Sequence, residues 1–328
     1  MNQTIILCAE GLSIGYAKKS VAAHLNLTLS AGELVCLLGQ NGAGKSTLIR
    51  TLAGMQAPLG GRTLVMGQDV RKLDARTLAQ RLSVVLTERV DAGALTVYDL
   101  VALGRYPYTD WTSRLQEDDK AAVARAIEAV GAADLAYRPV GELSDGERQK
   151  VMIARALAQE PALMILDEPT AFLDLPRRAE IMFLLRDLAR TSGRAILLST
   201  HDLDLALRTA DRVCLLANGR LTEGAPEDLV LSGAFASAFQ NEGVTFNVSE
   251  GAFHVERPHP TPIKLIGSGI YRVWTLRALE RAGFAVVENC VDCVEVTAGS
   301  HGVRYQVQRG GQSREYDTIY ALLAGLRG

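Results

Sequence analysis

The sequence predicts an α/β fold with a mixed sheet at its core, an antiparallel β subdomain, a helical subdomain and a small C-terminal α+β domain. Three unbroken apolar runs, ALMILD, RAILLST and DRVCLLAN, are separated by helical segments. Strands without alternation are typical of a parallel sheet that is covered on both faces. The earlier stretch HLNLTLSAGELVCLLG instead places Leu25, Leu27 and Leu29 on one face, which indicates antiparallel strands.

The changes of pattern along the chain predict the order of the elements. Short strands are expected over 5–64, where a glycine-rich loop and a helix interrupt them. Residues 96–159 look almost entirely helical, and one helix there, EDDKAAVARAIEAVGA, opens with acids and closes at Gly131, as the helix dipole favours. The Pro-rich stretch ERPHPTP, 256–262, is expected to be a linker that follows a large domain over 1–255.

A new pattern begins after this linker and predicts a small α+β domain over 263–328. A strand, IKLIG, precedes a helix, YRVWTLRALERAG, in which Val273, Leu276 and Leu279 recur at helical spacing and are expected in the core. Further strands and a last helix, EYDTIYALLAGL, follow. Because so short a domain is near the lower limit for a free-standing core, we expect it to regulate or pair subunits, with no chemistry of its own.

The bulk composition excludes several classes of protein. The 328 residues are 48% hydrophobic and 22% charged, and a formal net charge of −2 offers no general attraction to nucleic acid or anionic lipid. No stretch reaches the roughly 18 apolar residues that a membrane-spanning helix needs, and the first residues lack the basic start of a signal peptide. We therefore expect a cytosolic chain without a nucleic-acid partner.

The stretch GQNGAGKST fits the phosphate-binding pattern G-x-x-x-x-G-K-[ST], after the apolar strand LVCLL and before the helix STLIRTLAGM. Its glycines let backbone N–H groups close around phosphates, and Lys45 neutralises the β and γ oxygens. Ser46 or Thr47 supplies an oxygen to Mg²⁺. The expected nucleotide contacts are Gly39, Asn41, Gly42, Gly44, Lys45, Ser46 and Thr47.

Two further strand ends carry candidate catalytic groups. In LMILDEP, a buried strand delivers Asp167 to the metal and Glu168 beside it, where a carboxylate can polarise an attacking water. In STHD, His201 follows another buried strand and would project from the same sheet edge. A histidine in such a place can also be a packed core residue, but beside a P-loop we expect it to sense the γ-phosphate.

A second anion site is suggested by LSDGE. Ser144 and Glu147 have the spacing of a capping box, so one interpretation is simply a well-capped helix. That interpretation does not explain Gly146, which weakens a first helical turn by up to about 1 kcal/mol and suits the close approach of something large. Since the P-loop of this chain already serves its own nucleotide, we expect Ser144 and Gly146 to meet the phosphate of another subunit.

These motifs, GQNGAGKST, LSDGERQ, LMILDEPTAFLD and STHD, in this order and at these spacings, resemble the ATP-binding subunits of ABC transporters over roughly 5–255. The resemblance implies an ABC-type P-loop ATPase and a head-to-tail dimer in which the P-loop of one copy and the LSDGE of the other enclose each MgATP. It also implies that Tyr16 stacks on adenine and that Asp174 crosses the dimer interface.

One position departs from the family pattern, which usually has Gln where this chain has Glu88 after the strand SVVL. An ionised Glu only accepts hydrogen bonds and adds negative charge, and we expect Glu88 to approach the metal or its water. The following segment, LTVYDLVALGRYPYTDW, resembles subunits that energise uptake of iron chelates, haem and cobalamin. There Tyr106, Tyr108 and Trp111 would face the membrane partner; the alternative is a locally buried aromatic cluster.

The pair Cys290 and Cys293 forms a C-x-x-C without a second pair at zinc-finger spacing. Placed in one strand, the two side chains would point to opposite faces, which is poor geometry for a shared metal, and structural cysteines are expected.

We therefore expect the ATPase subunit of a bacterial or archaeal importer, bound peripherally at the cytoplasmic face of the membrane, for an iron-siderophore, haem or cobalamin type of cargo. Its expected partners are a second copy of itself, integral membrane permease subunits and, indirectly, a solute-binding protein. In hydrolysis Glu168 would act as base, Lys45, Mg²⁺ and the partner's Ser144 would stabilise charge, and His201 would hold the geometry. The alternatives are an exporter subunit and a soluble ABC ATPase that serves no transporter.

Overall fold

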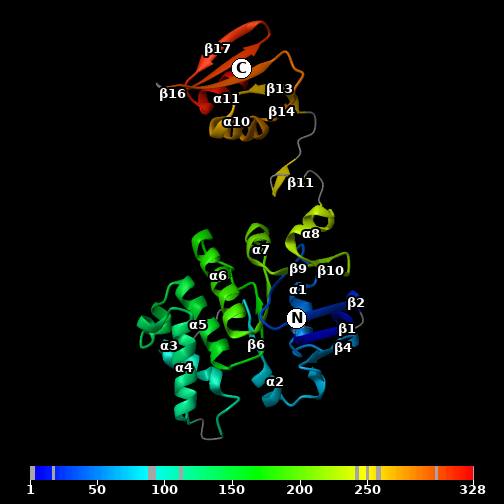
Figure 1. Cartoon of the computed structure of the whole chain (residues 1–328), viewed down its shortest axis with the longest axis vertical. Helices are drawn as coiled ribbons and strands as arrows, with labels where there is room; N and C mark the ends of the chain where they lie inside the picture. The colour runs from blue at the N-terminus through cyan, green and yellow to red at the C-terminus, as the bar shows by residue number, and fades with distance from the viewer. Residues whose placement is uncertain are drawn as a thin grey trace. The chain divides into compact units, whose positions relative to one another are not determined.

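The computed structural model describes residues 4–16, 19–87, 94–110, 114–240, 244–248, 251–255, 260–299 and 302–327 (Figure 1). The chain forms two compact units. The first is Met1–Gln240 together with Phe246–Phe253, and the second is Asn241–Thr245 together with His254–Gly328. The first unit holds a mixed sheet, an antiparallel sheet and helices, and the second a smaller α+β fold, which confirms the fold class predicted from the sequence.

An antiparallel sheet begins the first unit. Its strand order is β2-β1-β4-β5, with β1 at Ile5–Tyr16, β2 at Lys19–Ser30, β4 at Gly60–Val65 and β5 at Gln68–Asp69. The three leucines of β2 that were expected on one face, Leu25, Leu27 and Leu29, are all buried opposite β1. The alternation predicted for this region is therefore confirmed.

The central sheet has the order β10-β9-β3-β8-β7-β6, and only the edge strand β10 runs antiparallel to its neighbour. The strands are β3 (Leu34–Leu38), β6 (Leu82–Val85), β7 (Leu163–Asp167), β8 (Ala195–Ser199), β9 (Arg212–Ala217) and β10 (Arg220–Gly224). Every residue of β3, β7 and β8 is buried, because alternate side chains enter different hydrophobic clusters on the two faces. Although β3 lies inside the range expected to be antiparallel, its unbroken apolar run places it here.

Helices flank the central sheet. They are α1 (Lys45–Leu52), α2 (Ala75–Arg81), α6 (Leu175–Ser192), α7 (Leu203–Thr209), α8 (Pro226–Leu231) and α9 (Ala234–Phe239), with a 3₁₀ turn, η1, at Val70–Lys72. In the longest, α6, the Asp174 side chain accepts from the N–H of Arg177 at the start, and Gly193 takes a left-handed conformation at the end (φ 68°).

The part between β6 and β7 is helical where it is described. It contains α3 (Val97–Ala102), η2 (Leu103–Arg105), α4 (Glu117–Ala129), η3 (Ala133–Leu135), η4 (Val140–Glu142) and α5 (Asp145–Ala158). Helix α4 begins with three acidic residues in its first turn and ends just before Gly131, which has a positive φ of 65°. This agrees with the helix that the charge pattern predicted.

A short hairpin follows α9, and its middle part, Phe246–Phe253, belongs to the first unit. Strands β11 (Val244–Asn247) and β12 (Ala252–Val255) form a two-stranded sheet. Phe246 and Phe253 from this hairpin contact Phe235 and Phe239 of α9, with ring centroids 4.9 to 6.1 Å apart. Aromatic packing thus holds the chain against α9 shortly before it continues into the second unit.

The second unit is a sheet of order β14-β13-β15-β16-β17 with two helices. Its elements are β13 (Thr261–Ile266), α10 (Gly269–Ala282), β14 (Phe284–Val286), β15 (Cys293–Gly299), β16 (Gly302–Arg309), β17 (Gln312–Tyr316) and α11 (Ile319–Arg327). Leu279 is fully buried and Leu276 packs against the core, as expected. The expectation for Val273 was wrong: it lies on the other side of α10 and is 43% exposed.

The cysteine pair does not share a strand, contrary to the geometry assumed from the sequence. Cys293 begins β15, whereas Cys290 lies before it and its thiol donates to the carbonyl oxygen of Pro262. The Cys293 thiol donates to Gln308 Oε1.

Among the described residues no cluster of three or more His, Cys, Asp or Glu side chains could hold a metal ion. The helices that the structure describes also include none long and apolar enough to cross a membrane.

Candidate active site

The P-loop connects β3 to α1 in a conformation that depends on its glycines. Gly42 and Gly44 have positive φ angles of 80° and 105°, and Gly44 caps the N-terminus of α1. A Cβ at Gly39 would lie 2.4 Å from the carbonyl oxygen of Leu216, and one at Gly44 would lie 2.5 Å from Val21 Cγ1. These positions therefore exclude larger residues, and the loop presents its backbone at a helix N-terminus.

Lys45 is the buried cation of this loop. It is only 6% exposed, and its Nζ donates to the carbonyl oxygens of Gly39 (2.9 Å) and Gln40 (3.3 Å). Burial lowers the pKa of the Lys45 ammonium, while the carboxylates of Glu168 and Asp167 oppose that shift. The two carboxylates thus act on this ammonium although they are more than a hundred residues away in the sequence.

A buried serine joins the two acidic residues. Asp167 ends β7 and is 6% exposed, and its Oδ1 accepts from Ser199 Oγ at 2.7 Å. The same hydroxyl oxygen accepts from the backbone N–H of Glu168 at 2.9 Å. Glu168 has a positive φ of 51°, an uncommon conformation for a non-glycine residue, which turns the chain sharply after the strand.

The Glu168 carboxylate contacts the predicted histidine. His201 Nε2 lies 2.6 Å from Glu168 Oε1, and both side chains are partly exposed. The topology explains the meeting, because β3, β8 and β7 are neighbours in the parallel sheet and their carboxyl ends lie on one edge. The structure therefore brings together four of the predicted residues: Lys45, Asp167, Glu168 and His201.

The start of α5 has the capping box that the sequence predicted. Glu147 N donates to Ser144 Oγ, and Glu147 Oε2 accepts from Ser144 N at 2.8 Å. The Ser144 hydroxyl also donates to Glu147 Oε2 at 2.6 Å, and this hydrogen bond, together with the one from Ser144 N, lowers the pKa of the Glu147 carboxyl. Within the chain the neighbour of Gly146 is Arg177, since a Cβ at Gly146 would lie 3.3 Å from Arg177 Cδ. The end of a flexible side chain thus lies where Gly146 was expected to admit a larger group.

The remaining predicted nucleotide residues have local roles in the single chain. Tyr16 ends β1 with its side chain largely exposed, and its hydroxyl accepts from Thr47 Oγ1 at 3.2 Å, so the aromatic ring lies beside α1. Asp174 caps α6. Ser46, Asn41 and Gly42 are exposed on the P-loop.

Glu88 lies outside the described residues. Thr87, the residue before it, donates from Oγ1 to the carbonyl oxygen of Asp167 at 2.7 Å. Leu86, Thr87 and Glu168 also line one cavity of about 50 Å³ with residues of α5. The strand that leads to Glu88 therefore ends beside the acidic pair.

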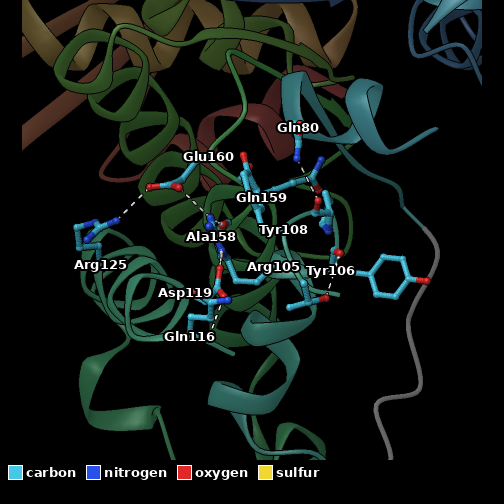
Figure 2. A network of polar contacts seen from close by, with 12 residues as sticks. Gln80, Arg105, Tyr106, Tyr108, Gln116, Asp119, Arg125, Ala158, Gln159 and Glu160 are labelled. Atoms are coloured by element: carbon cyan, nitrogen blue, oxygen red, sulfur yellow. Dashed lines mark hydrogen bonds and ion pairs between the residues drawn. The ribbon is translucent and has the colours of Figure 1, made fainter. Parts of the chain in front are cut away.

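Figure 2 shows the polar network that supports the segment with the predicted aromatics. Arg105 is 4% exposed, donates to Asp119 Oδ1 (2.9 Å) and Glu160 Oε2 (2.8 Å), and stacks 3.9 Å from the Tyr108 ring centroid. Arg125 also donates to Glu160. Although burial would raise the pKa of Glu160, the hydrogen bonds from Arg105 and Arg125 lower it overall. The network therefore anchors η2 to the ends of α4 and α5 with charge-assisted hydrogen bonds.

The predicted aromatics do not behave as one group. Tyr108 is partly buried below Arg105 and donates to the carbonyl oxygen of Gln159 at 3.0 Å, as a locally packed aromatic would. Tyr106 instead is 76% exposed, beside Leu103 at 56%. Trp111 lies outside the described residues. Of the two predicted tyrosines that the structure describes here, Tyr106 is thus the one on the surface.

Two residues with roles at the site escaped the sequence reasoning. Ser199, which bridges Asp167 and Glu168, is the last residue of the buried run AILLS. A polar residue at the end of a fully buried strand was the feature of the sequence that could have indicated a role at the site. Gln40 donates from Nε2 to the carbonyl oxygen of Ala238 at 3.2 Å. No local pattern indicates a partner 198 residues away.

Comparison with known proteins gives two family matches. Residues 22–171 match the ABC transporter family, and residues 260–327 match the iron ABC transporter C-terminal domain. An uncharacterized ABC transporter ATP-binding protein of Methanocaldococcus jannaschii is 42% identical over 79% of this chain and 89% of its own length. A probable siderophore transport system ATP-binding protein of Bacillus subtilis is 38% identical over 71% of this chain and 85% of its own.

A solved structure shares the fold. It is cbiO1 from Clostridium perfringens, part of the ABC transporter complex cbiONQ, with a TM-score of 0.63 and 29% identity over 72% of this chain and 94% of that one.

Proposed function

Because this chain belongs to the family of ABC transporter ATP-binding subunits, which are ATPases, we propose that it hydrolyses ATP to energise an importer for iron-chelate, haem or cobalamin cargo. The observation that supports hydrolysis best is the contact of Glu168 with His201 on the sheet edge that also carries Lys45 and Asp167. A carboxylate positioned by a second side chain beside a phosphate cradle is suited to activating water.

ATP would bind across the P-loop. The positive φ angles of Gly42 and Gly44 shape the loop, a Cβ at Gly39 or Gly44 would collide with neighbouring protein atoms, and the first N–H groups of α1 would point at the phosphates. Lys45 would leave the carbonyl oxygens of Gly39 and Gln40 and neutralise the β and γ oxygens. The exposed ring of Tyr16 would stack on the adenine.

The residues present also fit Mg²⁺. Ser46 offers an exposed hydroxyl and Asp167 a carboxylate that Ser199 holds in place, and both are the hard oxygen donors that Mg²⁺ prefers. Bound there, the ion would neutralise charge on the phosphate oxygens. Glu88 follows Thr87, which contacts Asp167, and is a further candidate to bind Mg²⁺ or one of its water ligands.

In hydrolysis Glu168 would accept a proton from the attacking water as it adds to the γ-phosphorus in line with the leaving oxygen. His201 would hold the Glu168 carboxylate in position through its Nε2 contact. Lys45 would stabilise the charge that develops on the phosphate oxygens.

Ser144, Gly146 and Asp174 would act across a head-to-tail dimer. Ser144 and Gly146 lie at the N-terminus of α5, where the helix dipole favours an anion. The phosphate at that end would belong to the ATP on the P-loop of the second copy, so Ser144 of one copy and Lys45 of the other would stabilise its charge together. Asp174 at the start of α6 would then lie at the interface between the copies.

The permease partner would bind at the side of η2 that carries Leu103 and Tyr106. The buried Arg105 fixes η2 in place through its hydrogen bond to Asp119. The subunit would then lie peripherally at the cytoplasmic face of the membrane, and a solute-binding protein would deliver cargo to the permease. The match to the iron ABC transporter C-terminal domain favours import over export. We propose a regulatory or pairing role for the second unit. The alternatives are an exporter subunit and a soluble ABC ATPase that serves no transporter.

The test is Glu168→Gln in the purified full chain. ATP binding should persist, measured by titration, while ATP hydrolysis should fall by about 100-fold or more because the general base is lost. The matched control is Glu10→Gln, which removes a carboxylate whose exposed ion pair with Arg62 contributes little to stability. Turnover of Glu168→Gln equal to that of Glu10→Gln would contradict the assignment.

A further inference from the structure

The P-loop is tied to a distant helix by one side chain. Gln40, the second residue of the loop, donates from Nε2 to the carbonyl oxygen of Ala238 at 3.2 Å. Ala238 lies in the last turn of α9, which ends at Phe239. Because the last four carbonyl groups of a helix have no partner within it, Gln40 caps the C-terminus of α9.

The backbone of Gln40 takes part in the phosphate cradle as well. Its carbonyl oxygen accepts from Lys45 Nζ at 3.3 Å, next to the 2.9 Å hydrogen bond from Lys45 to Gly39. An ammonium that turns toward a phosphate exchanges carbonyl contacts for phosphate oxygens, and its longer contact, to Gln40, is the weaker of the two. Phosphate binding is therefore expected to remove a hydrogen bond at the residue whose side chain caps α9, and the Gln40 carbonyl oxygen then keeps the hydrogen bond from Ala43 N (3.2 Å).

Helix α9 also packs against the β11–β12 hairpin through aromatic rings. Phe235 is fully buried, and its ring centroid lies 5.1 Å from that of Phe239 and 4.9 Å from that of Phe246. Phe253 contacts Phe246 at 5.0 Å. Since α9 has only six residues, a change at its C-terminal carbonyls reaches the Phe cluster within a turn or two.

We propose that Gln40 is a coupling residue, which transmits nucleotide binding at the P-loop to α9 and to the β11–β12 hairpin that carries the chain into the second unit. Without nucleotide, Lys45 and Ala43 hold the carbonyl oxygen of Gln40, and its side chain holds Ala238. With nucleotide, Lys45 leaves, the Gln40 carbonyl oxygen keeps the Ala43 N–H alone of these two donors, and the less firmly held residue weakens its cap on α9. This inference rests on the ATP binding proposed above.

Hydrogen–deuterium exchange on the full chain tests the coupling. The probe is a non-hydrolysable ATP analogue with Mg²⁺ at saturation, and protection of the P-loop amides over 39–47 reports its binding in the same sample. Loss of one neutral hydrogen bond predicts amide exchange about two- to tenfold faster in α9 and the hairpin when the analogue binds. Gln40→Ala should exchange fast in these elements without nucleotide and show no further change, while its P-loop is still protected.

The matched control is Gln80→Ala, which removes another glutamine amide bonded to a backbone carbonyl, that of Pro107, away from the P-loop and α9. It should respond like the wild type. P-loop protection without any change in α9 or the hairpin, or a response that survives in Gln40→Ala, would overturn the coupling and leave the proposed function intact. Absence of P-loop protection in the wild type would refute both.

Discussion

Replacing Ser199 by alanine should destabilise the first unit and slow hydrolysis together. Ser199 is fully buried and makes two hydrogen bonds, to Asp167 Oδ1 and from Glu168 N. A bond to a charged group contributes about 1.5–3 kcal/mol and a neutral one about 0.5–1.5 kcal/mol, so the variant should lose about 2–4.5 kcal/mol of unfolding free energy. For a unit of this size that corresponds to a fall in Tm of about 4–18 °C.

The chain provides its own control for this experiment. Ser83 is 3% exposed on β6 of the same sheet, but its Oγ has no hydrogen-bond partner among the described residues. Ser83→Ala removes the same atom without breaking a bond, so its Tm should stay within about 2 °C of the wild type, as expected for a change near 0.5 kcal/mol.

Both variants would be compared by thermal unfolding followed by far-ultraviolet circular dichroism and by steady-state ATPase rates. Ser199→Ala should also lower kcat by about 10- to 100-fold, because Asp167 and Glu168 lose the group that positions them. Equal melting and equal turnover for Ser199→Ala and Ser83→Ala would refute the reasoning that the bridge holds the acidic pair.

Four other predictions follow from the site and its supports. Arg105→Met should lower the unfolding free energy, measured by urea unfolding, by about 3–5 kcal/mol, because it leaves the buried Asp119 carboxylate without its cationic partner. A loss below about 1 kcal/mol would contradict this. Glu88→Gln should shift the Mg²⁺ dependence of ATP hydrolysis, and an unchanged metal titration would place Glu88 outside the site. A mixed dimer of Lys45→Ala and Gly146→Asp subunits should keep activity that neither homodimer has, and a verified but inactive mixture would count against action in trans. A chain that ends at Val255 should still bind and hydrolyse MgATP, and loss of binding by a folded truncated chain would refute the proposed division.

Much of the site was predictable because its chemistry lies in short stretches of sequence. The P-loop pattern depends on glycine conformations and on the helix that follows, both local properties, so Gly44 and Lys45 could be assigned from the sequence. The acidic pair and His201 could be assigned because each follows a buried apolar run, and such runs predict neighbouring parallel strands whose carboxyl ends share one edge.

The sequence did not predict which side chains of a predicted element would face the core. Tyr106 and Tyr108 are two residues apart and were expected to face a partner together, yet Arg105 covers only the second. Val273 had the spacing of a core residue but lies on the exposed side of α10. These outcomes depend on how neighbouring elements pack, which periodicity does not contain.

The amino-acid sequence by itself thus determined the fold class, the P-loop and the residue types at the catalytic strand ends, because each follows from interactions within about ten residues of chain. Only the tertiary structure decided that Ser199 joins Asp167 to Glu168 and that Gln40 caps α9. Ser199 is 32 positions from Asp167 and lies on the adjacent strand of the sheet, and Gln40 is 198 positions from Ala238. A buried polar group must find a partner wherever the fold offers one, and the order of residues along the chain does not specify which it will be.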